Sequence, residues 1–454
     1  MKLKYSAIIA LLILLSNHVK CQPLFKKGDR VCFIGNSITQ AGEFHHNILL
    51  YYATRFPDQR VDFYNCGIAG DVTARILKRI NSDILIHQPA YAVIMIGMND
   101  VYRSFYSTQN TTDRDILQKR KNALATYREN LDSIVRIFLS KKVKVILQKP
   151  SIYDQTAKLA AKNNYGANDA LKICGNFMQE LADKYHLLTV DYWSIMNNLN
   201  TELQKKDSTA TLIGPDRIHP RSVGNMVMSY QFLKTIGSPE YVSKIIINRN
   251  TKKSNRQSYN CIIKHVKVKN DILSFYGKEK ALPFPIDQSQ QQALILVPFI
   301  HDLNTELLQV KNLKKGNYKI IIDSTFVGTY TNFQLQQGIN LAAISHTPQY
   351  KQSLSVRDKL TELWKEEAGL RTIKYVQFDY LKKFSDNQKF SDIEAHLDSL
   401  KEIESNTWIK AQFDKYLILK PKEKELEQKS DILRVQVYMI NKPKEHCFKI
   451  IPAV

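Results

Sequence analysis

The stretch Val31-Cys32-Phe33-Ile34-Gly35-Asn36-Ser37-Ile38-Thr39 decides the fold of this chain. Its apolar first half predicts a buried strand, and the Gly-Asn-Ser that follows opens into a polar segment typical of a helix start. Ser37 would then lie where a strand ends and a helix begins. In an open α/β sheet ligands bind at that edge, and helix N-terminal amides favour a developing negative charge. Taken alone, the motif is more typical of an ordinary turn, so the rest of the chain must decide.

Residues 28–240 alternate short β-type runs with amphipathic helical stretches. The expected strands cover 30–34, 61–65, 90–96, 143–148 and 187–191, and the expected helices cover 44–56, 72–86, 117–139, 167–185 and 222–236. Five strands joined by helices predict a parallel sheet that is covered on both faces. This half of the chain is therefore expected to be an α/β domain with three layers.

The pattern changes after residue 240. Strands are expected over 261–268, 272–276, 293–300, 307–310, 318–323, 325–330, 432–440 and 447–451, and helices over 352–384 and 389–417. A chain of 454 residues is long for one domain. We therefore expect one domain over 22–240 and a second over 241–454, which is β-rich and carries a helical pair at about 352–417.

The N-terminus has the pattern of a signal peptide over residues 1–21. Lys2 and Lys4 precede a short apolar core at 7–15, which is too short to span a bilayer stably. Export to the periplasm, the cell surface or the medium is the prediction. Cys21 is an alternative lipid-attachment site, but it is not favoured because no run of small residues precedes it. No later stretch is apolar enough for a transmembrane segment.

The composition argues against a disulfide scaffold and against a metal or cofactor site. With 44% hydrophobic and 24% charged residues the chain is globular, and its six cysteines are too few for a disulfide scaffold. Cys32, Cys66 and Cys174 lie in apolar runs that favour buried thiols. Cys261 and Cys447 would pair if the first and last strands of the second half were neighbours. No metal-ligand spacing is present, so neither a metal nor another cofactor is expected.

The net charge of +22 comes from lysines mixed with acids over both halves. A nucleic-acid-binding protein would show a basic stripe or a known motif, and neither is present. Nucleic acid is therefore not an expected partner. An acidic polymer substrate is compatible with this charge, but a lysine-rich solvated surface is the favoured explanation. The sequence leaves the oligomeric state open.

Four polar signals follow the expected strands of the first domain. Ser37 follows the first strand, Gly70 the second and Asn99 the third, and the pair Asp216 and His219 stands between the fifth strand and the last helix. Each signal alone fits a turn or a helix cap. In a parallel sheet, however, these strand ends share one edge, so together they predict a single cleft.

The residue types suit nucleophilic catalysis. A serine hydroxyl needs a base, and a histidine three residues from an aspartate can be held in the right tautomer by it. Ser37, His219 and Asp216 are therefore the candidate catalytic residues. The N–H of Ser37, the N–H of Gly70 and the amide of Asn99 are the candidate oxyanion donors. His45 and His46, close after the serine, are expected to be structural or surface residues.

These four blocks resemble those of the SGNH (GDSL-like) hydrolase superfamily over about residues 28–240. The resemblance implies a flavodoxin-like α/β/α fold and a serine esterase. It assigns the nucleophile to Ser37, the oxyanion donors to Gly70 and Asn99, and the rest of the triad to Asp216 and His219. Asn36 departs from the family pattern, which usually has aspartate there. That aspartate is not the triad acid, so only local hydrogen bonding is expected to differ.

Export and the appended domain resemble bacterial esterases that remove acetyl groups from polysaccharides. An acylated carbohydrate is therefore the expected substrate. Tyr102, Phe105 and Tyr106 would stack on sugar rings, Arg103 would meet a uronate carboxylate, and Tyr153 would line the opposite wall of the cleft. Ordinary loop packing explains these residues equally well.

Two other functions remain open at this point. One is a lipid-directed esterase, lysophospholipase or thioesterase, although the loops after Asn99 and Pro150 are aromatic and polar rather than aliphatic. The other is a non-catalytic glycan-binding surface protein, with the β-rich domain as its working part. The second domain would bind polysaccharide, shield the cleft or stabilise the first domain, and the sequence does not rank these roles.

Overall fold

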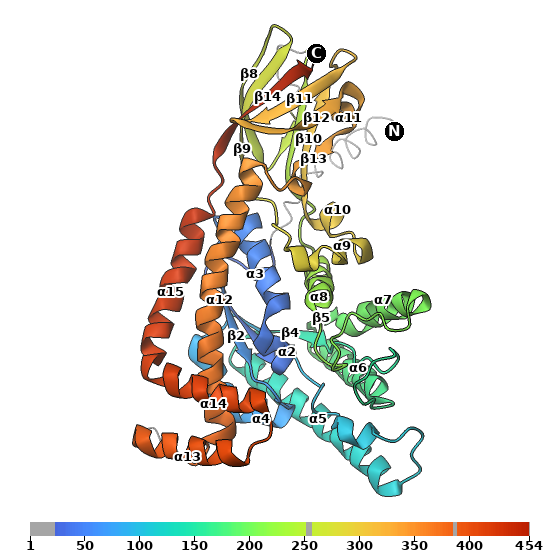
Figure 1. The fold of residues 1–454 in the computed structure, drawn as a ribbon, viewed down its shortest axis with the longest axis vertical. Helices are drawn as coiled ribbons and strands as arrows, with labels where there is room; N and C mark the ends of the chain where they lie inside the picture. The colour runs from blue at the N-terminus through green and yellow to red at the C-terminus, as the bar shows by residue number, and fades with distance from the viewer. Residues whose placement is uncertain (1–22, 251–256, 385–387, 454) are drawn as a thin grey trace, which may run out of the picture.

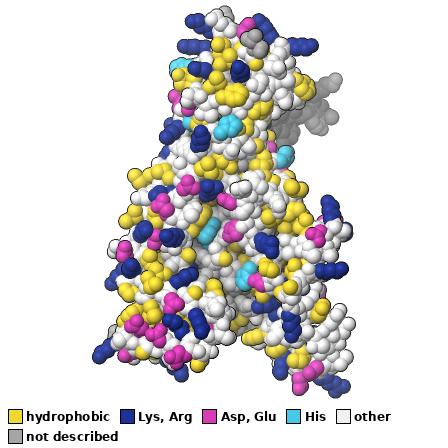
Figure 2. All heavy atoms as spheres, in the orientation of Figure 1, with side chains coloured by type: hydrophobic (Ala, Val, Ile, Leu, Met, Phe, Trp, Pro, Cys, Tyr) yellow, Lys and Arg dark blue, Asp and Glu magenta, His cyan; other side chains and the backbone are white. Residues whose placement is uncertain are grey.

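The computed structural model describes residues 23–250, 257–384 and 388–453. The expected signal peptide and Cys21 lie outside these ranges. Within them, no helix combines the length and apolar character that crossing a bilayer requires. Over the same ranges, no group of three or more His, Cys, Asp and Glu side chains is placed to hold a metal ion. The molecule is elongated, with an α/β unit in its lower part and a β-rich unit at its upper end (Figure 1). On the face seen in the same orientation, basic and acidic side chains occur over both parts (Figure 2).

The α/β unit contains the expected parallel sheet. Its strands run in the order β2-β1-β3-β4-β5, and all four pairings are parallel. The strands are β1 (Arg30–Gly35), β2 (Asp62–Gly67), β3 (Tyr91–Met95), β4 (Lys144–Lys149) and β5 (Leu188–Asp191). The prediction of five parallel strands is confirmed. In this order the sheet changes direction between β1 and β3. Such sheets open a crevice for ligands at this point.

Helices cover the sheet on both faces. The α/β helices are α2 (Ser37–Ala41), α3 (Glu43–Arg55), α4 (Thr73–Arg79), α5 (Arg114–Ser140), α6 (Ala167–Tyr185), α7 (Tyr192–Lys206) and α8 (Ser222–Thr235). Helix α3 contacts α8, while α4 contacts α5 and α5 contacts α6. The expected helix over 72–86 continues beyond α4 as a π-turn, Ile80–Ile84, and a short 3₁₀ turn, Leu85–His87.

Two glycines let the first helix lie close to the sheet. A Cβ atom on Gly67, at the end of β2, would lie 2.3 Å from the backbone N of Gln40. A Cβ on Gly35 would lie 2.3 Å from Oγ1 of Thr39 in α2 and 2.4 Å from the carbonyl O of Met95 in β3. Only glycine fits such close backbone approach. Helix α2, which begins at Ser37, is therefore set directly against the ends of the central strands.

Two segments predicted as strands are helical, and those predictions were wrong. Residues 293–300 form α9 (Ala293–Leu296) and the start of α10 (Phe299–Leu303), separated by Pro298. Residues 432–440 are the end of α15 (Glu423–Ile440), in which Leu433 and Val437 are buried one helical turn apart. Short apolar runs fit a buried helix face as well as a strand, so periodicity alone cannot separate them.

The β-rich unit is a sandwich of two sheets. One has the order β13-β10-β6-β7, from β6 (Tyr241–Asn248), β7 (Gln257–Tyr259), β10 (Thr305–Lys311) and β13 (Ile339–Asn340). The other has the order β12-β11-β14-β9-β8, from β8 (Cys261–Lys269), β9 (Ile272–Glu279), β11 (Asn317–Ile322), β12 (Thr325–Thr331) and β14 (Glu445–Ala453). Side chains of both sheets, among them Leu308 and Phe448, share one core.

Cys261 and Cys447 do not pair. Strand β9 lies between β8 and β14, so the strands that carry the two cysteines are not neighbours. Both thiols are free. The condition on which the pairing was predicted therefore fails.

Four helices, not the expected pair, lie between β13 and β14: α12 (Pro348–Tyr380), α13 (Phe390–Ile403), α14 (Thr407–Leu419) and α15. They run down one side of the α/β unit (Figure 1). Helix α12 contacts α2, α3 and β2. Val356, Leu360 and Leu363 of α12 belong to the same buried core as the parallel sheet. The chain thus leaves the sandwich, packs along the α/β unit and returns as β14.

Candidate active site

Ser37 is the first residue of α2, directly after β1. The preceding Asn36 caps this helix, because its Oδ1 accepts a hydrogen bond from the N–H of Ile38 at 3.1 Å. Asparagine and aspartate cap a helix N-terminus about equally well. Asn36 therefore supplies a side-chain oxygen at this position without a carboxylate.

Ser37, His219 and Asp216 form a continuous hydrogen-bonded chain. The Oγ of Ser37 lies 2.7 Å from Nε2 of His219, although 182 residues separate them. The Nδ1 of His219 lies 2.5 Å from Oδ2 of Asp216. A carboxylate at Nδ1 favours the tautomer with its proton there, which leaves Nε2 free to accept the serine proton. The three predicted catalytic residues are thus brought together in the order that nucleophilic catalysis needs.

Asp216 is held as a carboxylate. Burial favours its neutral form, but the hydrogen bond from the His219 side chain and two backbone N–H donors outweigh this and lower the pKa of Asp216 below its ordinary value. The two donors are the N–H groups of Ile218 (3.0 Å) and His219 (3.1 Å), which both bind Oδ1. One carboxylate oxygen therefore shapes the loop while the other holds the imidazole.

Arg217, between the two triad residues, anchors this loop, and the sequence analysis assigned it no role. It is buried, and its backbone φ of 68° lies in the left-handed region. Its guanidinium donates to four carbonyl oxygens, those of Asp154 (2.9 Å), Ala157 (2.9 Å), Leu159 (3.0 Å) and Ala161 (2.9 Å). Nothing in the spacing of the motif marks such a role, because the four acceptors are main-chain groups far away in sequence.

Replacing Arg217 with alanine should lower the free energy of unfolding by about 2 kcal/mol or more, since the carbonyl groups of two buried and two half-buried residues lose their donor. Urea unfolding followed by circular dichroism measures this change. Arg221→Ala is the matched control, because Arg221 is exposed in the same region and should leave the midpoint near the wild-type value. An unchanged midpoint in Arg217→Ala would contradict the anchoring role.

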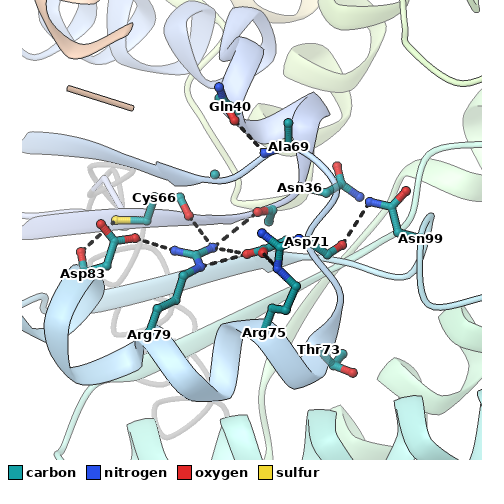
Figure 3. Close-up of polar contacts among 12 residues, drawn as sticks. Asn36, Gln40, Cys66, Ala69, Asp71, Thr73, Arg75, Arg79, Asp83 and Asn99 are labelled. Atoms are coloured by element: carbon teal, nitrogen blue, oxygen red, sulfur yellow. Dashed lines mark hydrogen bonds and ion pairs between the residues drawn. The ribbon is translucent and has the colours of Figure 1, made fainter. Parts of the chain in front are cut away.

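The two other predicted oxyanion donors lie on the loops after β2 and β3. These strands flank β1 in the sheet, so both loops border Ser37. Gly70 has a φ of 75°, which favours glycine. The Nδ2 of Asn99 donates to the carbonyl of Asp71 at 3.0 Å, and its Oδ1 accepts from Nη1 of Arg103 at 3.1 Å. The Asn99 amide is therefore held from both ends, with its Nδ2 directed toward the loop that contains Gly70 (Figure 3).

The loop that carries Gly70 is itself braced. The N–H of Ala69 donates to Oε1 of Gln40 at 2.6 Å. The Asp71 carboxylate forms ion pairs with Arg75 (3.0 Å) and Arg79 (2.7 Å). Figure 3 shows these contacts arranged around the loop, with Arg79 between Asp71 and Asp83. Sequence analysis named none of these bracing residues.

The predicted substrate-binding residues have different outcomes. Tyr102 is 50% exposed and stacks on Phe105, with ring centroids 5.5 Å apart. Nη1 of Arg103 donates to the carbonyl of Met98 at 2.5 Å and to Asn99. Arg103 thus orients the Asn99 amide, a contact that the sequence analysis did not anticipate.

Tyr106 and Tyr153, which were also predicted to contact substrate, are both buried. Tyr106 is 5% exposed, and the guanidinium of Arg120 covers its ring at 4.2 Å. Tyr153 is 1% exposed, and its hydroxyl accepts from the N–H of Asn164 at 2.9 Å. Aromatic side chains in a loop pack inward as readily as they line a cleft, so their type alone did not decide.

His45 and His46 have structural contacts, as expected. His45 is buried, and its Nε2 lies 3.0 Å from the carbonyl of Thr39. Burial lowers the pKa of His45 to about 4, so it is neutral at neutral pH. The ring of His46 stacks on Trp364 of α12, with centroids 4.3 Å apart. Neither ring is bonded to the triad in the structure.

Two hollows lie near the loop that carries Asp216 and His219, although no triad residue is among the lining residues of either. The first, of about 410 Å³, has polar and aromatic lining residues that include Glu43, His46, Asp287, Gln290, Arg357 and Trp364. It connects to the triad loop through Asn225, whose Nδ2 donates both to Glu43 (3.1 Å) and to the carbonyl of Pro220 (3.1 Å). The second, of about 480 Å³, is more aliphatic, with Leu159, Leu203, Leu212, Val223, Ile295 and Leu296 in its lining.

Comparisons with known proteins agree with this geometry. Residues 33–227 match the model of the GDSL-like lipase/acylhydrolase family. An acetylxylan esterase of Geobacillus stearothermophilus is 24% identical over 229 residues, which cover 46% of this chain and 94% of the relative. A gut microbial diltiazem-metabolizing enzyme of solved structure is 32% identical, with a TM-score of 0.86, over 95% of this chain and 99% of that one. That similarity extends over both halves of the chain.

Proposed function

We propose that Ser37 is the nucleophile, His219 the general base and Asp216 the acid of the triad, because the chain belongs to the GDSL-like lipase/acylhydrolase family. Members of this family are SGNH hydrolases, and the chain is a serine hydrolase of ester bonds. The observation that carries this proposal is the chain of hydrogen bonds of 2.7 Å and 2.5 Å that joins the three side chains. A non-catalytic surface protein is set aside, since this family hydrolyses esters.

The hydrogen bonds of the triad support a reaction in two steps. Ser37 Oγ attacks the acyl carbonyl while His219 Nε2 takes the serine proton, and Asp216 stabilises the imidazolium that forms. The N–H groups of Ser37 and Gly70 and the amide of Asn99 stabilise the oxyanion of the tetrahedral intermediate. His219 then gives its proton to the departing alcohol. Water, activated by the same histidine, releases the carboxylic acid from Ser37.

The substrate that we propose is an acetyl ester of a carbohydrate. The relative from Geobacillus stearothermophilus is an acetylxylan esterase. The relative that matches the whole chain metabolises diltiazem, and diltiazem itself carries an acetyl ester. The polar and aromatic hollow beside the triad loop suits a hydroxylated ring, because carboxylates such as Glu43 and Asp287 accept hydrogen bonds from hydroxyl groups. Exposed Tyr102 is a further surface on which such a ring would stack.

Export is part of the proposal and rests on the pattern of residues 1–21. The catalytic domain is proposed to comprise residues 22–240, with 241–454 as the appended domain. Acetylated polysaccharide outside the cytoplasm is then the setting in which the enzyme acts.

Purified protein should release acetate from at least one member of a panel of acetylated polysaccharides and oligosaccharides. Acetate is measured by a coupled assay, with Ser37→Ala as the blank. Equal release by the wild-type protein and the blank would contradict the triad mechanism. Hydrolysis of small acetyl esters without release from any glycan would contradict the carbohydrate substrate alone.

A lipid-directed esterase or thioesterase is the alternative, and the more aliphatic hollow of about 480 Å³ favours it. The two proposals differ in acyl-chain preference, because a long acyl chain needs an apolar channel. A series of p-nitrophenyl esters of increasing chain length distinguishes them. Falling kcat/KM beyond the acetyl ester supports the carbohydrate esterase, and a preference for long chains supports the alternative.

A further inference from the structure

The loop between β2 and α4 is packed by the C-terminal helices. Ile68, in this loop, is fully buried. It belongs to a hydrophobic cluster whose other buried members all come from the segment that contains α12, α13 and α14: Ile373, Tyr375, Val376, Leu381, Leu397, Phe413 and Tyr416. The loop that carries Gly70 is therefore seated in a core that the α/β unit alone does not supply.

Arg371 of α12 contacts this loop and the sheet directly. It is buried, and its Nε donates to the carbonyl of Gly67, the last residue of β2, at 3.1 Å. Its Nη1 and Nη2 form a bidentate pair with Asp83, at 2.8 Å and 2.9 Å. Asp83 lies on the π-turn after α4, a type of distortion that is frequent at functional sites. One side chain thus ties α12 to the start of the loop and to the element behind it.

Asp83 also forms an ion pair with Arg79. The Nη1 of Arg79 lies 2.5 Å from Oδ2 of Asp83. The same guanidinium donates to the carbonyl of Cys66 at 2.9 Å and, from Nε, to the Asp71 carboxylate at 2.8 Å. Figure 3 shows Arg79 between Asp83 and Asp71, with the carbonyl of Cys66 beside it. The contacts that lead from Asp83 through Arg79 thus reach both ends of the loop that carries Gly70.

This series of contacts ends at two candidate oxyanion donors, Gly70 and Asn99. Gly70 lies between Ala69, whose N–H is held by Gln40, and Asp71, whose carboxylate is held by Arg75 and Arg79. The carbonyl of Asp71 accepts from the amide of Asn99. Arg75 also pairs with Asp379 near the end of α12, which is a second link to the same helix.

The buried charges in this series of contacts balance. Asp71 and Asp83 face Arg79 and Arg371, and all four side chains are almost fully buried. Burial opposes the charge of Asp83, but Arg371 and Arg79 outweigh it and hold the pKa of Asp83 far below its ordinary value. Removing one member of such a group leaves an uncompensated buried charge. The arrangement is therefore sensitive to the loss of any one of its members.

We propose that Arg371 is a positioning residue for the oxyanion hole, and that α12 holds Gly70 and Asn99 in place through Asp83, Arg79 and Asp71. This inference rests on the proposed roles of Ser37, Gly70 and Asn99. The sequence left three roles open for the second domain: binding polysaccharide, shielding the cleft or stabilising the first domain. The role proposed here differs from these, because the C-terminal helices position groups of the catalytic centre. A displacement of about 1 Å in a catalytic group costs roughly a hundredfold in rate, so a remote arginine is able to control turnover.

Two variants test this proposal on the full chain with p-nitrophenyl acetate. Arg371→Lys keeps the charge, but its ammonium cannot bind Gly67 and both oxygens of Asp83 in the same fork geometry. We expect kcat to fall about tenfold to a hundredfold, with KM and the pH dependence of kcat/KM unchanged, because binding and the triad remain intact. Arg371→Ala should lose more. Arg371 lines a cavity of about 280 Å³, so millimolar guanidinium should enter and restore part of the kcat of Arg371→Ala.

Arg434→Lys is the matched control. Arg434 of α15 is also buried, pairs with Glu367 at 2.6 Å and lines the same cavity, but it has no contact with Gly67 or Asp83 among those described. It should lose stability and keep kcat near the wild-type value. Wild-type kcat in Arg371→Lys, or an equal loss in Arg434→Lys, would overturn the positioning role. If Arg371→Ala does not fold, Arg371→Lys decides alone. Full activity of Ser37→Ala would instead overturn the proposed function.

Discussion

Ser37→Ala should lower kcat for a small acetyl ester by about 10⁴-fold or more, because no other hydroxyl in the described contacts is bonded to His219. The residual rate would come from the oxyanion donors and substrate binding alone. Steady-state kinetics on p-nitrophenyl acetate measure the loss. The fold should not change, because the capping hydrogen bond that Asn36 accepts from the N–H of Ile38 does not involve the serine side chain.

Ser104→Ala provides the control for this experiment. Ser104 is exposed in the loop after Asn99, close to the same cleft, and it has no bond to the triad among those described. Its kcat and melting temperature should match those of the wild-type protein. Turnover by Ser37→Ala at more than a small fraction of the wild-type rate would contradict the role of Ser37.

Asp216→Asn should lower kcat by about 10⁴-fold, with little change in KM. The asparagine still accepts hydrogen bonds at one position, but it cannot stabilise a positive imidazolium or hold the proton on Nδ1 of His219. The bonds from the Ile218 and His219 amides to Oδ1 can persist, so the loop should keep its shape. The effect therefore reports on charge and tautomer rather than on folding.

Asp207→Asn is the control for charge loss. Asp207 is exposed, and its Oδ1 also accepts hydrogen bonds from within its own loop, at Thr209, but no histidine contacts it in the structure. Its activity should remain near the wild-type value. Equal rates in Asp216→Asn and the wild-type protein would show that the 2.5 Å contact with His219 is not used in catalysis.

Much of the α/β unit could be predicted from the sequence. The five strands were expected because buried parallel strands are continuous apolar runs, as in β1. The grouping of Ser37, Asp216 and His219 was expected for a topological reason, since the carboxyl ends of parallel strands share one edge. Local patterns and sheet topology agreed over this part of the chain.

The remaining site residues depend on long-range packing, which no local pattern reveals. Arg217 binds carbonyl groups about 60 residues away, and Arg371 binds Asp83 across 288 residues. Tyr106 and Tyr153 have the residue type of a sugar platform but pack inward. A single sequence shows which residues are able to do chemistry, whereas the structure shows which of them face the cleft.

The second half illustrates the same limit. Its strands over 261–268 and 272–276 were predicted and correspond to β8 and β9, which pair antiparallel. The apolar run at 432–440 was predicted as a strand because the partner surface on the α/β unit was not known. That surface selects a helix, in which Leu433 and Val437 face one core.

Covalent labelling is the most direct test of whether Ser37 is the nucleophile. Full-length protein is treated with a fluorophosphonate, digested and analysed by mass spectrometry, and Ser37→Ala is treated in parallel. We expect one stoichiometric adduct, on the peptide that contains Ser37, with loss of esterase activity in proportion to labelling and no adduct in the variant. An adduct on a different residue that accompanies the loss of activity, or undiminished hydrolysis by fully labelled protein, would contradict this role.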